Sequence, residues 1–72
     1  MKDMTFFTQI LFDTNGNVTG KGTTEYTSID SAEQAFHTAI ASAISKAETG
    51  KIIAIIFDED GVVKFRRVWT RV

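Results

Sequence analysis

The 72-residue chain contains no cysteine and no proline, and its only histidine is His37. Without cysteine the protein has neither disulfides nor thiolate metal sites, and one histidine cannot build a nitrogen-rich zinc site. A chain of this length buries only about 60% of the surface that its unfolded form exposes, so small domains usually depend on a disulfide, a metal or a partner subunit. We therefore expect no metal and no cofactor, and either a well-packed core or self-association.

Neither sign of charge dominates, because the chain has eight basic and nine acidic residues. The composition therefore does not favour nucleic acid or an anionic membrane as a partner. The longest apolar run, Ile52 to Phe57, is far shorter than the roughly 20 residues of a membrane helix. The first five residues include Asp3 and no apolar segment, unlike a secretory signal. With no linker-like stretch, residues 1–72 are expected to form one cytoplasmic domain.

A short internal repeat organises the chain. The segment ILFDTNGNV at 10–18 is echoed by IIFDEDGVV at 55–63, and each reads as a strand end, a turn and a new strand. Asn-Gly or Asp-Gly between apolar runs is a strong hairpin signal because glycine accepts the positive φ that the turn requires. A three-residue loop with a glycine bulge fits both sites. The pattern predicts two antiparallel hairpins, 4–13 with 17–26 and 51–58 with 62–71.

A helix is predicted between the hairpins. Its apolar residues recur at helical spacing, namely Ala32, Ala35, Phe36, Ala39, Ile40, Ala43, Ile44 and Ala47. Asp30 and Glu33 have the spacing of a capping box, and Gly50 is placed to stop the helix. We predict an α+β fold, ββαββ, with a four-stranded antiparallel sheet in the order 2-1-3-4 and the helix packed on one face.

One helix covers one face, yet apolar side chains occur on both sides of the first and third strands. Such a surplus is typical of a contact surface, and we expect a homo-oligomer, with a dimer favoured. The alternative is that strand twist and side-chain stems cover both faces. The predicted interface consists of Phe7, Leu11, Ile53, Ile55, Phe57, Phe65 and Trp69, since the turn register aligns the last two with the third-strand residues.

The last predicted strand interleaves cations with aromatics. In one interpretation it binds nucleic acid, with cations on phosphates and aromatic rings on bases, through Lys64, Arg66, Arg67, Trp69 and Arg71. In the other, the charges protect an exposed sheet edge against unwanted pairing. The near-neutral net charge favours the protected edge, and nucleic acid stays the alternative partner.

No catalytic set is recognisable, and we do not expect an enzyme. The Asp13/Asn15 and Asp58/Asp60 pairs resemble parts of a calcium loop, but the twelfth position of each would be Thr24 or Trp69 instead of glutamate. The glycines at 16, 20 and 22 lack the lysine and the strand-to-helix context of a phosphate loop. His37 is expected at the margin of the helix's apolar stripe, without a partner that would orient it for catalysis.

The chain resembles small uncharacterised proteins encoded by phages and prophages of gut bacteria. The resembling segments are TQILFD at 8–13, KGTT at 21–24, AFH at 35–37, IASA at 40–43, DEDG at 58–61 and VW at 68–69. The resemblance implies a viral or mobile-element origin and expression inside a bacterial host. It also implies work done by binding a host protein or a small molecule, and it transfers no role to any residue.

Overall fold

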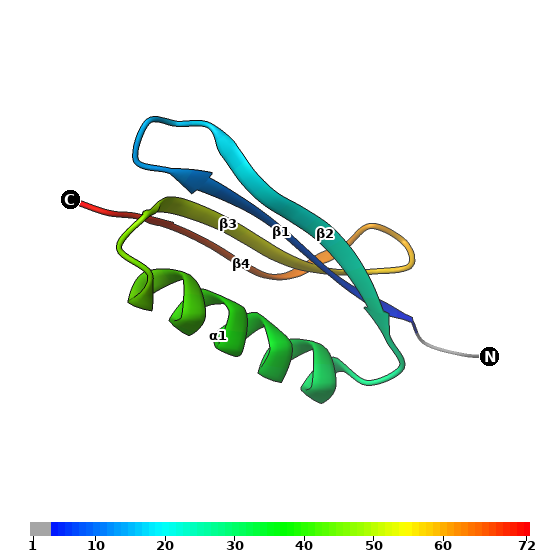
Figure 1. The fold of residues 1–72 in the computed structure, drawn as a ribbon. Helices are drawn as coiled ribbons and strands as arrows, with labels where there is room; N and C mark the ends of the chain where they lie inside the picture. Colours follow the sequence, from blue (N-terminus) through cyan, green and yellow to red (C-terminus); the bar gives the residue numbers. More distant parts are fainter. Residues whose placement is uncertain (1–3) are drawn as a thin grey trace.

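The computed structural model describes residues 4–72, which form one helix across one face of a four-stranded sheet (Figure 1). The elements are β1 (Thr5–Asp13), β2 (Val18–Tyr26), α1 (Ile29–Ser45), β3 (Thr49–Asp58) and β4 (Val63–Thr70). The strand order is β2-β1-β3-β4 and every neighbouring pair is antiparallel. The predicted fold class and strand order are confirmed.

The N-cap of the helix lies two residues before the predicted cap Asp30. Ser28 has an extended backbone, and its Oγ accepts hydrogen bonds from Asp30 N at 3.2 Å and Ser31 N at 3.4 Å. Ser28 is therefore the N-cap, and the predicted capping box of Asp30 and Glu33 is wrong. Asp30 lies instead in the first turn, where its negative charge is favourable near the positive end of the helix dipole.

The helix ends at Ser45, earlier than the predicted stop at Gly50, and a residue from the other end of the chain completes it. The Nη2 of Arg71 donates to the carbonyls of Ile44 and Lys46 at 3.0 and 2.9 Å, and its Nε donates to that of Thr49 at 2.9 Å. The guanidinium also lies 4.8 Å from the centre of the Trp69 ring. Arg71 thus satisfies carbonyls that a helix end leaves unpaired and ties α1 to β4.

The core lies between α1 and the two central strands. The helix contributes Ala32, Phe36, Ile40 and Ala43, and the strands contribute Phe7, Ile52, Ala54 and Ile56. Phe36 meets Phe7 edge-on with 6.0 Å between ring centres, a geometry that aromatic pairs prefer. Ala32 and Ala54 are fully buried, which is consistent with a helix that lies close to the sheet.

The two hairpins are equivalent, with each residue of the first matching the one 45 positions later, as Asp13 matches Asp58. Phe12 pairs with Val18 and Leu11 with Gly20, which leaves Thr19 as an extra, bulged residue. In the second hairpin Phe57 pairs with Val63 and Ile56 with Phe65, which leaves Lys64 as the extra residue. The pairing of Gln9 with Ala54 lies on a local two-fold axis between the hairpins. The two copies of the sequence repeat therefore also share the same strand pairing within their hairpins.

The two turns use the same hydrogen bonds. Asp13 Oδ1 accepts from the backbone N–H groups of Asn15 and Asn17, each at 2.9 Å. Asp58 Oδ1 accepts from those of Asp60 and Val62 at the same distance. The glycines Gly16 and Gly61 have φ values of 87° and 81°, which confirms the predicted glycine at the left-handed position of each loop.

These turns predict a loss of stability in acid. The backbone N–H of Asn17 is the main cause that lowers the pKa of Asp13, and that of Val62 is the main cause for Asp58. A carboxylate whose pKa is lowered by folding stabilises the protein above its unfolded value, and this contribution disappears as the pH falls through the folded value. We expect the urea midpoint to decrease as the pH falls below about 4.

The double variant Asp13→Asn/Asp58→Asn isolates this effect. An amide oxygen can accept the same backbone hydrogen bonds but does not titrate in this range. The double variant should therefore show a flatter dependence of the urea midpoint on pH than the natural chain. Equal slopes for the two proteins would mean that other carboxylates cause the acid sensitivity.

Candidate functional site

The first candidate surface is the face of the sheet opposite α1, and we call it the helix-free face. Strand alternation and register place two groups of side chains on it. The apolar group is Phe6, Ile10, Phe12, Val18, Ile53, Ile55, Phe57, Val63 and Val68. The polar group on the outer strands is Lys21, Thr23, Glu25, Arg66 and Thr70. The apolar side chains concentrate on the two central strands. The helix lies on the other side of the sheet, and no other element within residues 4–72 covers this face (Figure 1).

The polar groups at the centre of this face already have partners. The hydroxyl of Thr8 lies 2.7 Å from that of Thr23, and it also lies 3.3 Å from the carbonyl of Gly22, to which it can donate. Lys51, at one end, has its Nζ 5.0 Å from the centre of the Phe12 ring. Because a partnered hydroxyl costs much less to bury than an unpartnered one, the central part of the face can be covered without leaving Thr8 unsatisfied.

The predicted interface residues do not share one face. Ile53, Ile55 and Phe57 lie on the helix-free face, but Phe7 is buried beneath α1, with 5% of its surface exposed. Leu11 and Trp69 pack against the core, and Phe65 contacts Phe36 with 6.2 Å between ring centres. The predicted alignment of Phe65 and Trp69 with Ile53 and Ile55 is therefore wrong.

The bulge at Lys64 explains the error. The register inferred from the sequence allowed for the glycine of the turn but not for the extra residue Lys64. With Lys64 bulged, Phe65 pairs with Ile56 instead of Ile55. A shift of one residue moves every following side chain to the other face of the sheet. The bulge accounts for Phe65 and Trp69 and for the missed Val68. The prediction also took Phe7 and Leu11 in place of their β1 neighbours Phe6, Ile10 and Phe12, which pair with the helix-free face of β3, and it missed Val18 and Val63 on the outer strands. The alternation of Phe6, Ile10 and Phe12 along one strand was the signal that could have identified three of them.

The basic and aromatic residues of the last strand are also divided. Arg66 lies on the helix-free face, whereas Arg67 and Trp69 lie on the helix side. Lys64 Nζ is 3.6 Å from Asp58 Oδ2, and Arg71 binds the end of α1. The five residues therefore do not form one continuous surface on which a nucleic acid strand could lie.

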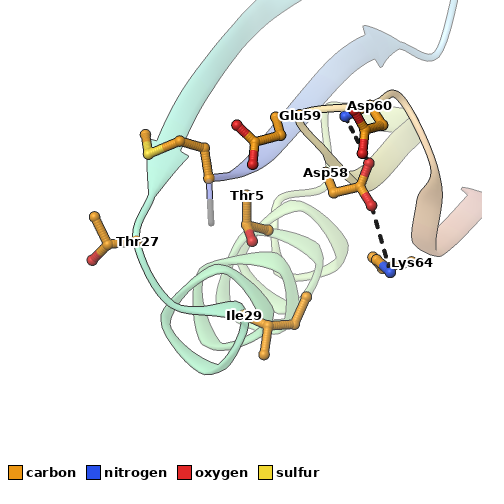
Figure 2. Close-up of a pocket in the computed structure, with 8 residues that line it drawn as sticks. Thr5, Thr27, Ile29, Asp58, Glu59, Asp60 and Lys64 are labelled. Carbon is orange, nitrogen blue, oxygen red and sulfur yellow. Dashed lines mark hydrogen bonds and ion pairs between the residues drawn. The ribbon is translucent and has the colours of Figure 1, made fainter. Parts of the chain in front are cut away.

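A hollow of about 500 Å³ lies where the second turn meets the start of β1 and the connection from β2 to α1 (Figure 2). Its carboxylates belong to Asp58, Glu59 and Asp60, and Lys64 stands opposite Asp58. Asp58 Oδ1 is occupied by the turn's own N–H groups. Within residues 4–72 no three histidine, aspartate or glutamate side chains are grouped to hold a metal ion. The carboxylate of Asp58 therefore shapes the turn.

A second hollow, of about 640 Å³, is an open groove between α1 and β2. Phe7, Ala35 and Ala39 form its apolar part, and its other lining residues are uncharged amides and hydroxyls: Gln9, Thr24, Tyr26, Ser31, Gln34, Thr38 and Ser42. The groove exists because Gly20 and Gly22 stand where the second hairpin has Phe65 and Arg67. A Cβ built on Gly22 meets no atom within 4 Å, so this glycine leaves open space beside the helix.

His37 is exposed on α1, with its Nε2 3.6 Å from Glu33 Oε2.

Among the described residues, no helix is long and apolar enough to cross a membrane. Comparison of the chain with protein-family models, with curated proteins and with solved structures finds no match. The geometry of the chain itself is therefore the basis for a functional proposal.

Proposed function

We propose that this chain is a non-enzymatic binding module that self-associates through its helix-free face, with a face-to-face dimer as the basic unit. Its origin is a phage or prophage, and it works in the cytoplasm of the bacterial host on a host protein or a small molecule. The observation that carries the proposal is the uncovered row of apolar side chains on β1 and β3, from Phe6 and Phe57 to Phe12.

The size of the face supports a second copy as its occupant. Four strands about 4.8 Å apart, each eight to ten residues long at about 3.3 Å per residue, make a face of roughly 20 by 30 Å. Its projected area of roughly 600 Å² approaches the about 800 Å² per partner of a standard stable interface. Two such sheets can pack face to face as in a β-sandwich, with the apolar rows interdigitated.

The distribution of polar groups also supports a second copy. Phe6 and Phe57 stack with 5.4 Å between ring centres and present a flat apolar surface near one end. Of the charged residues of the face, Lys21, Glu25 and Arg66 stand on the outer strands and Lys51 stands near one end of β3. An apolar centre with a polar rim is the usual anatomy of a protein interface.

The solution mass of two variants tests this proposal. Val68 lies on the helix-free face and is 42% exposed in the single chain, so that Val68→Lys should fold but place a charge inside the interface. We expect the natural chain to have at least twice the mass of 8.0 kDa by light scattering after size exclusion. The face contact should be lost in Val68→Lys, and the effect should be larger in Ile55→Lys.

Val62→Lys is the matched control, because Val62 is an exposed valine in the second turn and not on the helix-free face. It should keep the mass of the natural chain. A natural chain that stays at 8.0 kDa up to millimolar concentration would refute self-association. Equal behaviour of Val62→Lys and Val68→Lys would show that the helix-free face is not the contact.

A further inference from the structure

The sheet has two open edges, β2 and β4, and they differ in charge. β2 carries one cation and one anion, Lys21 and Glu25. β4 and the residue after it carry Lys64, Arg66, Arg67 and Arg71 and no carboxylate. Rows of like charge are a common protection of sheet edges, and two copies of β4 brought side by side would repel each other. The β2 edge has no such protection.

The backbone groups at the β2 edge are positioned to pair with another strand. The carbonyl of Gly22 lies 3.3 Å from Thr8 Oγ1 on β1, so it points into the sheet. Because successive residues of an antiparallel strand direct their N–H and C=O groups to opposite sides, those of Lys21, Thr23 and Glu25 point to the open edge. Each of these three residues offers one donor and one acceptor.

A second copy of β2 fits this edge with a two-fold axis at Thr23. In that antiparallel register Thr23 meets Thr23 of the second copy, and Lys21 meets Glu25 of the second copy, twice by symmetry. Within residues 4–72 the ion pairs join His37 to Glu33 and Lys64 to Asp58, so Lys21 and Glu25 have no ion-pair partner among the described residues. Opposite charges directly across a strand pair stabilise it, and like charges destabilise it.

The helix side of the same register is also complementary. Gly22 meets Thr24 of the second copy, and Gly20 meets Tyr26 of the second copy. A Cβ built on Gly22 would meet no atom within 4 Å, so the glycines leave room for these larger neighbours. An aromatic ring placed across from a strand glycine covers the backbone that the glycine exposes. On the helix side of the pairing, larger residues thus stand opposite glycines.

We propose that β2 is a second self-association surface, through which two copies join edge to edge into one continuous eight-stranded sheet. The two helices then lie on the same side, with the neutral grooves beside β2 facing each other across the two-fold axis. This pairing uses a different surface from the face-to-face contact and does not depend on it. With both contacts formed, four copies make two eight-stranded sheets that pack face to face.

Charge reversal at the two paired positions tests the edge contact. Lys21→Glu places glutamate against Glu25 twice per pair, and Glu25→Lys places lysine against Lys21 twice. We expect each single variant to weaken the edge contact about tenfold or more at low salt, and Lys21→Glu/Glu25→Lys to restore it to within about threefold. Dissociation constants come from the concentration dependence of the mass. The control is Arg66→Glu, a basic residue on the same face but on the opposite edge, which should leave this contact unchanged.

Amide hydrogen exchange separates the two contacts. In the edge pair the outward N–H groups of Lys21, Thr23 and Glu25 become protected, whereas a face contact alone leaves them open. Ile55→Lys should leave an edge dimer with these amides protected, and Lys21→Glu should leave a face dimer with these amides exchanging freely. Loss of the edge signals in Lys21→Glu with recovery in the double variant supports the proposal. Unprotected amides at every concentration, no recovery in the double variant, or open-ended growth of the assembly would overturn it.

Discussion

Replacing Ile56 by alanine is expected to lower the free energy of unfolding by about 2–5 kcal/mol, the usual cost of removing a large buried aliphatic side chain. Ile56 is 0% exposed and lies between its strand neighbours Phe7 and Phe65, beneath α1. A chain of this size has a total stability of roughly 4–11 kcal/mol. This single change therefore removes a large share of the total, and urea unfolding followed by Trp69 fluorescence measures it.

Ile55→Ala is the matched control, because it makes the same chemical change at the next position of the same strand. Ile55 is half-buried on the helix-free face of the single chain. At concentrations where the protein is monomeric, Ile55→Ala should lower the free energy of unfolding by less than half as much as Ile56→Ala. If Ile56→Ala does not fold, Ile56→Val should cost about 0.5–1.5 kcal/mol. Equal costs at the two positions would contradict the assignment of α1 to one face.

Gly50→Ala is expected to destabilise the protein by about 1–3 kcal/mol, the range for overpacking a tight site. A Cβ on Gly50 would lie 2.5 Å from the carbonyl oxygen of Asp13 and 2.9 Å from Thr14 Cα. Both are backbone atoms, so relief requires a shift of the first turn relative to β3. The register is irregular at this point, and the Gly50 carbonyl also accepts from Arg71 N at 2.8 Å. A shift there therefore disturbs both hairpins together.

Gly22→Ala is the control for this effect. The added methyl meets no atom within 4 Å and the backbone φ is not positive. An alanine in a strand costs less conformational entropy on folding than a glycine. The free energy of unfolding of Gly22→Ala should therefore be within about 0.5 kcal/mol of that of the natural chain, or slightly higher. Urea midpoints of the two variants give the comparison. Similar losses for both would mean that backbone entropy, and not close packing, explains the result at Gly50.

Local chemistry explains what sequence reasoning predicted correctly. The two turns depend on residues within five positions of one another, from Asp13 to Asn17 and from Asp58 to Val62. The apolar spacing of α1 and the two hairpins left few ways to build the sheet, and the order β2-β1-β3-β4 followed from antiparallel neighbours with apolar strands in the centre.

The missed features depend on contacts that local patterns do not contain. Lys64 reads as an ordinary strand residue, yet as a bulge it decides which face receives Phe65 and Trp69. Gly50 resembles a helix stop, but its role is set by Asp13, far away in the chain. The end of α1 is likewise completed by Arg71, whose hydrogen bonds reach back 25 and 27 residues. The interface prediction failed where register, and not composition, determines the surface.

The hydrogen bond that closes the first turn also affects how the protein ages chemically. Asn-Gly is the sequence most prone to deamidation, which begins when the glycine nitrogen attacks the asparagine side chain and closes a succinimide ring. In the native turn Gly16 N donates to Asp13 O at 3.1 Å, and its φ of 87° holds the loop in one conformation. Attack at Asn15 therefore requires the turn to open, and we expect the rate at which Asn15 converts to aspartate and isoaspartate to follow how often the first hairpin loosens at its tip.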